Sequence, residues 1–538
     1  MGASELLVVV TVAHVLLAAE WLLRDRSLAH LAILETYQRT LVLADLVDRA
    51  GGGLSVLAHP WTLPGIVREA SGYRPPLLMI TAQPAMAVFG ESIQAAAVAN
   101  LGWIAVLLWS TARIARAASD EVGGLLAALA LGACPAVLGH RGLFLPFLPA
   151  AACVAAFTAA FTDDAFPARR RTQVAAGVWM GLAMLARWDV IAVMAAIAAG
   201  RFLDVPAAVR SRLLRGCGVA GAVALLVAGW WYATNLIDTF ELYLGEGIIS
   251  TAHDHERMVE LSSWDNAWYY PVRFGRHQLG WPLAVLCFAA VVVVVRGRVR
   301  GWRTLVLWLV GAWPLYLAVP MKSSRYVLPI VPVFAIALGI AVRRVPARAR
   351  AAAAWALGAA LVAQTLAIVA LPGAERVWPT LVNTPAWRQY DQFRWEDALD
   401  HGQPRAWTDG AWADVVARAI DALGPGQDGH PPHLLLVEEP LNAYTMPLHV
   451  SRRVHTISSL GLLHLDPRQI AYLLKRLDHI ALAGPPLDRA VAAHFATQSF
   501  ATRQLVAVLL PELARREVVY EGLLPDGYPL RVFGPRMR

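Results

Sequence analysis

Long apolar stretches separated by short polar segments fill the first 372 residues, and this pattern predicts membrane-spanning helices. A helix of about 20 apolar residues crosses the hydrocarbon core, because lipid cannot hydrogen-bond an exposed backbone. The first stretch lacks the basic start and small-residue cleavage site of a signal peptide, so we expect it to be retained as a helix. About eleven spans are predicted, at residues 5–23, 78–112, 121–138, 144–163, 172–186, 188–203, 214–234, 279–296, 304–320, 326–342 and 351–372.

The second predicted span, residues 78–112, is too long for one straight crossing. Pro75 and Pro76 precede it, and Pro84 lies inside it. Because proline interrupts the hydrogen bonds of a helix, we expect this span to begin as a short broken segment near the outer surface.

After residue 372 the apolar runs shorten, and Pro, Gly, Asp and His become frequent. Strand-like and helix-like segments alternate there, which predicts a small α/β domain with a partly parallel sheet over 373–538. Val518–Tyr520 and Leu530–Phe533 flank a Pro-Asp-Gly turn and predict a closing hairpin. The earlier segments are the strands His433–Val437, Val454–Ile457 and His479–Ala483, and the helical patterns near 411–423, 467–477 and 503–516.

The composition agrees with a membrane protein, with 57% hydrophobic and 16% charged residues and a mean hydropathy of +0.49. The formal net charge is +8, but the basic residues stand at the ends of the predicted spans, so nucleic acid is not an expected partner. Membrane lipids with anionic headgroups are expected to attract this charge instead. Four cysteines lie inside apolar runs without metal-type spacing and are predicted to be core residues: Cys134, Cys153, Cys217 and Cys287.

The arginines alternate between segments in a way that predicts the topology. With the N-terminus in the cytoplasm, the predicted inner loops hold seventeen arginines and the short outer turns hold four basic residues. The loops 24–77 and 235–278 and the domain 373–538 are then extracytoplasmic. The inner arginines are Arg113, Arg116, Arg169, Arg170, Arg171, Arg201, Arg210, Arg212, Arg215, Arg296, Arg298, Arg300, Arg303, Arg343, Arg344, Arg348 and Arg350; the outer residues are Arg141, Arg187, Lys322 and Arg325.

The two long outer loops are not featureless. Glu35–Arg49 has apolar residues at helical spacing and predicts an interfacial helix that ends at Gly51-Gly52-Gly53. The loop 235–278 is rich in acids, histidines and aromatics, and a loop this long is more often functional than not. His253 and His255 carry metal-ligand side chains, although their spacing on a loop is weak evidence for a metal site.

Two candidate sites for chemistry lie in the first outer loop. The carboxylate of Glu35, close to Tyr37, is placed to act as a general base towards an acceptor; alternatively it is a solvated acid favoured by a helix N-terminus. Arg74 follows Tyr73 and precedes two prolines that fix an extended chain. Its guanidinium either binds a phosphate or reaches for the membrane interface.

Two further candidates lie in the short outer turns. Arg187 and Asp189 either pair with each other or leave the guanidinium available for an anion. Lys322 and Arg325 are cations on the side where the positive-inside rule disfavours them, and Tyr326 follows them. They either bind a lipid-linked phosphate or anchor the chain at headgroups. No cofactor is firmly predicted, although a divalent metal is possible.

The same segments resemble the motifs of the GT-C membrane glycosyltransferases, in the branch of the protein O-mannosyltransferases and aminoarabinose transferases. The likeness covers residues 1 to about 345 in the family's order, with weaker echoes at Trp230–Asn235 and from Trp264–Tyr270 to Gly280-Trp281-Pro282. The four motifs are Glu35-Thr36-Tyr37, Tyr73-Arg74-Pro75-Pro76-Leu77 with the apolar run to Phe89-Gly90, the Gly-Leu-rich span Gly181–Arg187, and Lys322–Pro329 with its Lys-x-x-Arg-Tyr-x-Leu-Pro pattern.

The resemblance implies a multi-pass protein of the bacterial inner (plasma) membrane that moves a sugar from a polyprenyl-phosphate carrier to an extracytoplasmic lipid, polysaccharide or protein of the cell envelope, usually with inversion. By position, Glu35 is the acidic catalytic residue near the acceptor. The carrier phosphate is held by the cations, and Tyr37, Tyr73 and Tyr326 are weaker candidates for the sugar or acceptor. The cations are Arg74, Arg187, Lys322 and Arg325.

Two departures from the family pattern leave an alternative open. Leu34 stands where the family's Asp is expected, and the outer turn from His140 to Pro146 lacks the usual acid. The alternative is a catalytically inactive lipid-binding or scaffold protein with the same fold. A transporter is disfavoured, because acids are nearly absent from the predicted spans.

Overall fold

The computed structural model describes most of the predicted membrane region and the strands of the C-terminal region. The chain divides into two units: Met1–Asp25, Val42–Thr251 and Glu256–Pro404 form the first, and Arg26–Leu41, Ala252–His255 and Arg405–Arg538 the second. The predicted boundary at residue 372 stays a prediction. The described residues are 2–24, 31–72, 74–244, 262–318, 324–370, 418–419, 433–437, 455–458, 479–483, 511–523 and 529–536.

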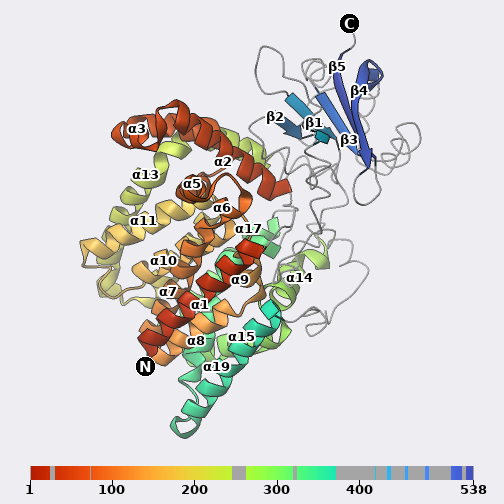
Figure 1. Ribbon diagram of the computed structural model, residues 1–538. Coiled ribbons are helices and arrows are strands. Elements are labelled where there is room, and N and C mark those ends of the chain that lie inside the picture. The colour runs from red at the N-terminus through yellow and green to blue at the C-terminus, as the bar shows by residue number, and fades with distance from the viewer. Residues whose placement is uncertain are drawn as a thin grey trace. The chain divides into compact units, whose positions relative to one another are not determined.

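Helices dominate the described part of the membrane region (Figure 1). The first helices in chain order are α1 (Ala3–Arg24), α2 (Leu31–Arg49), α3 (Gly52–Ala58), η1 (Pro60–Thr62), α4 (Leu63–Ser71), α5 (Leu77–Phe89), α6 (Ile93–Ala97), α7 (Ala99–Ala118), α8 (Glu121–Gly132), α9 (Pro135–His140) and α10 (Phe147–Phe161). They are followed by α11 (Arg170–Ala186), α12 (Val190–Asp204), α13 (Ala207–Leu244), α14 (Trp264–Arg273), η4 (Phe274–Gln278), α15 (Trp281–Arg296), α16 (Trp302–Val310), α17 (Trp313–Ala318), η5 (Ser324–Ile330), α18 (Pro332–Val342) and α19 (Ala347–Ala370).

Every predicted span overlaps a helix, and five described helical segments are long and apolar enough to cross a membrane. The number of crossings stays a prediction, since several helices are shorter than a bilayer requires. The five segments are Ala3–Leu23, Ile93–Ala118, Ala207–Ile237, Arg325–Val342 and Ala347–Val369. The helix predicted to end near Gly51 is confirmed, because α2 ends at Arg49 and Gly51 adopts a left-handed φ of 92°.

The break in the second span lies at a different place from the one expected. Pro84 is inside α5, whereas the chain turns at Gly90, where φ is 85°. A new helix starts after Ser92, whose hydroxyl accepts a hydrogen bond from the backbone N–H of Ala95 at 3.0 Å. The span therefore begins as a short separate segment, as expected, but a left-handed glycine and an N-cap interrupt it and not a proline.

The outer loop predicted at 235–278 is partly helical. Helix α13 continues to Leu244, past the predicted end of its span, and α14 and the π-helix η4 occupy 264–278. A helix satisfies its backbone hydrogen bonds locally, so it can extend beyond the hydrocarbon without a new partner. The loop 24–77 is likewise mostly helical, from α2 to α4.

Close approach of helix backbones builds the membrane region. A Cβ atom added at Gly339 of α18 would lie 2.2 Å from the carbonyl oxygen of Gly123 in α8. Gly177 and Gly181 of α11, spaced four apart, face α13, and a Cβ at Gly177 would lie 2.5 Å from the carbonyl oxygen of Ala220. Small residues at this spacing let membrane helices meet backbone to backbone, which compensates for the weak hydrophobic drive within lipid.

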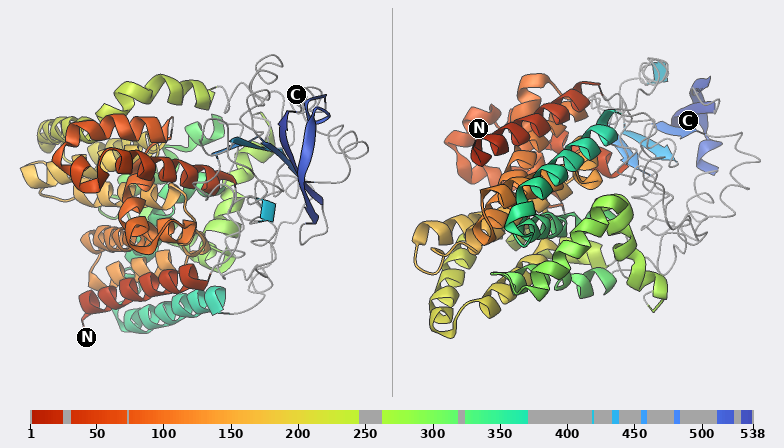
Figure 2. Two further views of the ribbon diagram at one scale, coloured as in Figure 1. Left: turned by 45° about the horizontal axis from the view of Figure 1, so that its top comes forward. Right: turned by 90° about the horizontal axis from the view of Figure 1, so that it is seen from below.

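Helix α10 is the centre of this packing. All of its residues from Phe147 to Phe161 are buried, and it contacts α7, α11, α12 and η5. Figures 1 and 2 show the helices of this region running alongside one another. Three of the four cysteines, all free thiols, are buried as expected, while Cys217 is half-buried.

The described strands of the second unit form one mixed sheet with the order β2-β1-β3-β5-β4. Strand β1 (His433–Val437) pairs in parallel with β2 (His455–Ser458) and β3 (His479–Ala483), while β4 (Arg516–Leu523) and β5 (Pro529–Arg536) are antiparallel. The predicted parallel strands and hairpin strands are confirmed. The Pro-Asp-Gly turn and most of the residues predicted as helices here lie outside the described residues.

Candidate functional site

Arg187 and Asp189 occupy the turn between α11 and α12. The chain becomes extended at Arg187, with φ −157° and ψ 138°, which ends α11. The Arg187 Nε and Nη2 atoms each donate to one oxygen of Asp189, both at 2.8 Å. The side chains are only 14% and 8% exposed, so this two-pronged pair is largely shielded from solvent. The ion pair that the sequence left as one alternative is therefore formed.

Arg325 and Tyr326 lie in η5, the 3-10 helix that leads into α18. The indole Nε1 of Trp308 in α16 donates to the carbonyl oxygen of Pro329 at 3.0 Å. Since Val327, Leu328 and Ile330 are fully buried, η5 is held between neighbouring helices. This packing fixes the backbone that carries Arg325 and Tyr326.

The two arginines meet on one pair of aromatic rings. Phe147, the first residue of α10, and Tyr326 have ring centroids 5.8 Å apart. The Arg187 guanidinium carbon lies 4.2 Å from the Phe147 centroid and 5.1 Å from that of Tyr326. The Arg325 carbon lies 5.3 Å and 5.8 Å from the same centroids. Both cations are therefore within a Debye length of about 10 Å of each other, and we call Arg187, Asp189, Phe147, Arg325 and Tyr326 the arginine–aromatic cluster.

His140 borders this cluster and was not identified as a site residue from the sequence. Its imidazole packs edge to face on Phe147, with 6.1 Å between the ring centroids. Its Nδ1 contacts the carbonyl oxygen of Ala136 at 2.8 Å, and a carbonyl can only accept, so Nδ1 carries the proton. The pKa of His140 is lowered to about 4, chiefly by burial and also by the nearby positive charge of Arg325, whereas the bond to Ala136 acts to raise it. The ring is thus neutral at physiological pH.

The turn after His140 is fixed by a buried amide. The Asn100 Nδ2 atom contacts the carbonyl oxygens of His140, Arg141 and Leu143 at 3.4, 3.2 and 2.8 Å. Arg141 in this turn is only 2% exposed. Burial lowers the pKa of Arg141 to about 10, while the carboxylate of Glu20 acts to raise it. Asn100 is a polar amide within an otherwise apolar predicted span, a signal in the sequence that could have pointed to this arrangement but was not used.

Adjacent residues of α13 anchor the segments that carry Arg74 and Arg187. The Trp231 Nε1 donates to the Ser71 hydroxyl at 2.9 Å, and the Tyr232 hydroxyl donates to the Met184 carbonyl at 2.9 Å. Each anchor point lies three residues before an arginine. Arg74 itself is half-buried in the bend before α5, and its backbone N–H donates to Ser71. Residues of the Trp230–Asn235 segment, which weakly resembles the family pattern, therefore hold the segments of Arg74 and Arg187 against one helix.

The other predicted site residues are described less fully. Glu35 lies in the second turn of α2, so a favourable helix dipole does not account for it; its side chain is outside the described residues. Tyr37 is buried in the same helix. Tyr73, Lys322 and the histidines at 253 and 255 are also outside the described residues. Among the side chains that the structure describes, no three acids, histidines or cysteines gather to hold a metal ion.

The cluster has the chemistry of an anion site next to a hydrophobic wall. Two guanidinium groups supply planar arrays of N–H donors that match phosphate oxygens, and Asp189 orients one of them. The aromatic rings hold the cations in place. A neutral histidine and a tyrosine hydroxyl add polar groups suited to a sugar or an acceptor.

Comparison with known proteins gives a clear result at the level of structure. The sequence matches no family model and no curated protein. ArnT from Cupriavidus metallidurans bound to undecaprenyl phosphate is similar over 99% of this chain and 98% of its own, with TM-score 0.61 and 14% identity. The oligosaccharyltransferase AglB from Archaeoglobus fulgidus, in complex with an inhibitory peptide and a dolichol-phosphate, is similar over 97% and 74%, with TM-score 0.53 and 11% identity.

The arabinofuranosyltransferase AftD from Mycobacteria adds a third structure, similar over all of this chain but only 40% of its own length, with TM-score 0.53 and 14% identity. At these identities the likeness concerns the fold, and it extends through both the membrane region and the C-terminal region. Three separate transferases share the arrangement, as the motifs in the sequence led us to expect. The chain therefore has the fold of the GT-C membrane glycosyltransferases.

Proposed function

We propose that this protein is an integral-membrane glycosyltransferase that moves a sugar from a polyprenyl-phosphate carrier to an extracytoplasmic acceptor of the cell envelope. The observation that carries the proposal is the convergence of Arg187 and Arg325 on Phe147 and Tyr326. The GT-C fold and the undecaprenyl phosphate bound to the similar ArnT structure support it. We place the protein in a bacterial inner membrane, with the N-terminus in the cytoplasm and the C-terminal region outside.

The proposed reaction needs two kinds of group. The carrier phosphate leaves as the glycosidic bond breaks, and cations that balance its charge allow it to leave without a general acid. We assign this role to Arg187 and Arg325, together with Arg74 and Lys322. The acceptor must lose one proton as it attacks, and we assign the general base to Glu35 on the resemblance alone.

The charge balance of the cluster fits a phosphate ligand. Arg187 and Arg325 bring two positive charges, and Asp189 brings one negative charge. The pair with Asp189 positions the Arg187 guanidinium against Phe147, so the donor array is already ordered before a ligand arrives. Preorganised donors stabilise developing charge at little cost in reorganisation. His140 stays neutral beside them, so Arg187, Arg325 and Asp189 set the charge of the site.

The test is transfer of a radiolabelled sugar from purified polyprenyl-phosphate sugars by the full chain in liposomes, with carrier binding measured separately. We expect Arg325→Gln to weaken undecaprenyl phosphate binding and to lower transfer about 100-fold or more, as for removal of one oxyanion donor. Glu35→Gln should lower transfer by about 100-fold to 10,000-fold while binding is kept. Arg171→Gln, an exposed arginine of the opposite, predicted inner side, is the matched control.

The results separate an enzyme from an inactive protein of the same fold. If the protein binds the carrier but transfers sugar from none of the common carriers, and Glu35→Gln leaves this behaviour unchanged, it is a scaffold or lipid-binding protein. If Arg325→Gln and Arg171→Gln bind the carrier equally well, the arginine–aromatic cluster is not the phosphate site.

A further inference from the structure

We propose a second anion site at the other end of the membrane region, which binds the phosphate group of an anionic membrane lipid in the inner leaflet. A cavity of about 410 Å³ opens between the end of α12, the loop between α10 and α11, and the loop between α15 and α16. This volume is in the range of pockets that hold small molecules. The arginine distribution assigns this end to the cytoplasm, and the proposal depends on that orientation.

Positive charge dominates the lining of the cavity. Four arginines and two aspartates line it, which leaves a formal excess of two positive charges. A fifth arginine is close, because Arg344 donates through Nη2 to the carbonyl oxygen of Gly297, next to the lining. The charged lining residues are Arg201, Arg298, Arg300, Arg303, Asp164 and Asp204.

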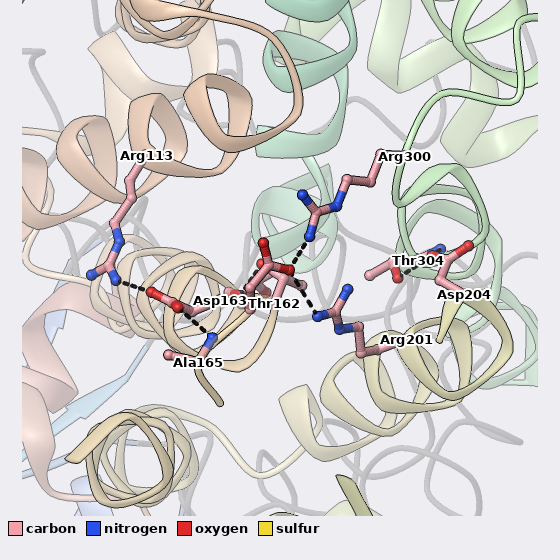
Figure 3. A network of polar contacts seen from close by, with 10 residues as sticks. Arg113, Thr162, Asp163, Ala165, Arg201, Asp204, Arg300 and Thr304 are labelled. Atoms are coloured by element: carbon pink, nitrogen blue, oxygen red, sulfur yellow. Dashed lines mark hydrogen bonds and ion pairs between the residues drawn. The ribbon is translucent and has the colours of Figure 1, made fainter. Parts of the chain in front are cut away.

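The two acids are already engaged by other groups. Asp164 pairs with Arg300 and, at 3.7 Å, with Arg201. Figure 3 shows Arg201 and Arg300 reaching inward from two sides of this network. One Asp204 oxygen accepts from the backbone N–H and the hydroxyl of Thr304, at 2.9 and 2.6 Å. The acids therefore order the walls of the cavity and leave much of the arginine charge uncompensated.

The backbone conformation of Arg298 is the strongest single indication of a ligand. It is the one non-glycine residue with positive φ, 44°, in the part of the chain that the structure describes. The Val299 N–H donates to the carbonyl of Val294 at 3.2 Å, a bond typical of the turn that ends a helix. In this turn the residue before the donor, here Arg298, is left-handed and is usually glycine. Arginine costs energy in this conformation, and Gly297 stands one residue away. Strain retained at one exposed cation indicates a use for its charge.

Several of the lining arginines keep N–H donors for a ligand. Within the described residues, Arg298 makes no ion pair. Arg201 is only 8% exposed, and its buried Nε has no hydrogen-bond acceptor. Arg303 uses Nη1 to donate to the carbonyl of Leu203 at 2.8 Å and packs over the Trp302 ring at 5.3 Å. A buried unsatisfied donor is costly unless a ligand or water meets it.

The surroundings favour a lipid over a free anion. The cavity lies where α12 ends and α16 begins, at the boundary of apolar helices, and Trp302 begins α16. Tryptophan is enriched at the level of lipid headgroups. Valine and proline side chains complete the lining, which suits a glycerol and the start of an acyl chain: Val205, Val209, Val299, Pro167 and Pro206. Basic pockets between membrane helices on the cytoplasmic side suit lipid phosphates.

The test uses native mass spectrometry of the full-length protein in detergent, titrated with phosphatidylglycerol and, as reference, phosphatidylcholine. We expect selective binding of phosphatidylglycerol that weakens about fivefold in Arg298→Gly and about fivefold in Arg303→Gln, the value of one basic residue near an anionic surface. Glycine accepts a φ of 44°, so Arg298→Gly should melt at the same temperature as the unmodified protein or higher. Arg348→Gln, an exposed arginine of α19 that does not line the cavity, should keep the affinity.

Three outcomes would overturn the proposal. Equal binding of the two lipids, or equal weakening by Arg298→Gly and Arg348→Gln, would mean that the cavity is not a selective lipid site. Thermal stabilisation by inorganic phosphate at millimolar concentration, without any preference for phosphatidylglycerol, would show a site for a free anion instead. Sugar transfer plays no part in these measurements, so their failure is distinct from a failure of the proposed function.

Discussion

Replacing Asp189 with asparagine tests whether the ion pair at the arginine–aromatic cluster stabilises the fold. The substitution keeps the shape but removes one negative charge and one of two acceptors for Arg187. Breaking a buried pair from one side costs about 3–5 kcal/mol. Contact of the guanidinium with the Phe147 and Tyr326 rings persists and offsets part of this, about 1–2 kcal/mol. We therefore expect the free energy of unfolding to fall by about 1–4 kcal/mol.

The assay is SDS titration of the full chain in mixed micelles, followed by tryptophan fluorescence. A matched control exists in α2, where Arg49 pairs with Asp45 at 2.6 Å but the side chains are 72% and 39% exposed. Asp45→Asn should change the free energy of unfolding by no more than about 1 kcal/mol, since solvent screens an exposed pair. The double variant Arg187→Gln/Asp189→Asn should lose less than the sum of the two single changes, because the pair acts as a unit.

Carrier binding by the same variants decides what Arg187 is for. If the guanidinium contacts phosphate, Arg187→Gln should lower the affinity for undecaprenyl phosphate about tenfold or more. Asp189→Asn keeps the cation and loosens only its position, so it should lower the affinity less. A purely structural pair predicts that both single variants lose stability and affinity together. Our reasoning is refuted if Asp189→Asn and Asp45→Asn have the same small effect on unfolding.

Two further predictions concern packing and pH. Gly339→Ala should destabilise the protein by about 1–3 kcal/mol, because its Cβ would meet the backbone of Gly123. The control Gly221→Ala has open space around it and should stabilise its helix by up to about 1 kcal/mol. Equal effects of the two variants in thermal unfolding would contradict this packing. His140 has a pKa of about 4 in the fold and an ordinary value of 6.5, so its contribution to stability is complete above pH 6.5 and is lost as pH falls towards 4. The loss reaches about 3 kcal/mol, and unfolding measured from pH 7 to 4 should show a flatter profile for His140→Gln than for the unmodified protein.

The positions of the membrane helices could be predicted because the signal is local. A helix in lipid must be apolar over its own length, so each predicted span overlaps at least one described helix. The ends of the helices were less predictable. The break at Gly90 and the extension of α13 to Leu244 depend on backbone conformation and capping, which hydropathy does not report. Pro84 shows the limit of a composition rule, because the helix around it continues.

The charged residues of the candidate site could be predicted from the sequence, but not which of them meet in the folded protein. Arg187 and Arg325 stand out in the sequence as cations on the disfavoured side, but 138 positions separate them. The residue that brings them together is Phe147, which has no chemical group to single it out among the many apolar residues of α10. His140 joins the cluster through the same ring. Convergence of this kind depends on tertiary packing, which pairwise spacing in one sequence does not contain.

The arginines predicted to lie on the outer and the inner side differ in how the protein holds them, and the predicted topology gives a physical reason for the difference. An arginine on the predicted inner side agrees with the positive-inside bias and can pair at the surface, as Arg113 does with Asp163. A predicted outer arginine opposes that bias, and local groups offset the cost: a shielded carboxylate and aromatic rings for Arg187, and the nearby carboxylate of Glu20 for the buried Arg141. These contacts also restrict the side chains to one orientation. Cations that are costly to place and fixed in direction are what a phosphate site requires, so the same physics that makes outer arginines rare makes those that remain suited to bind an anion.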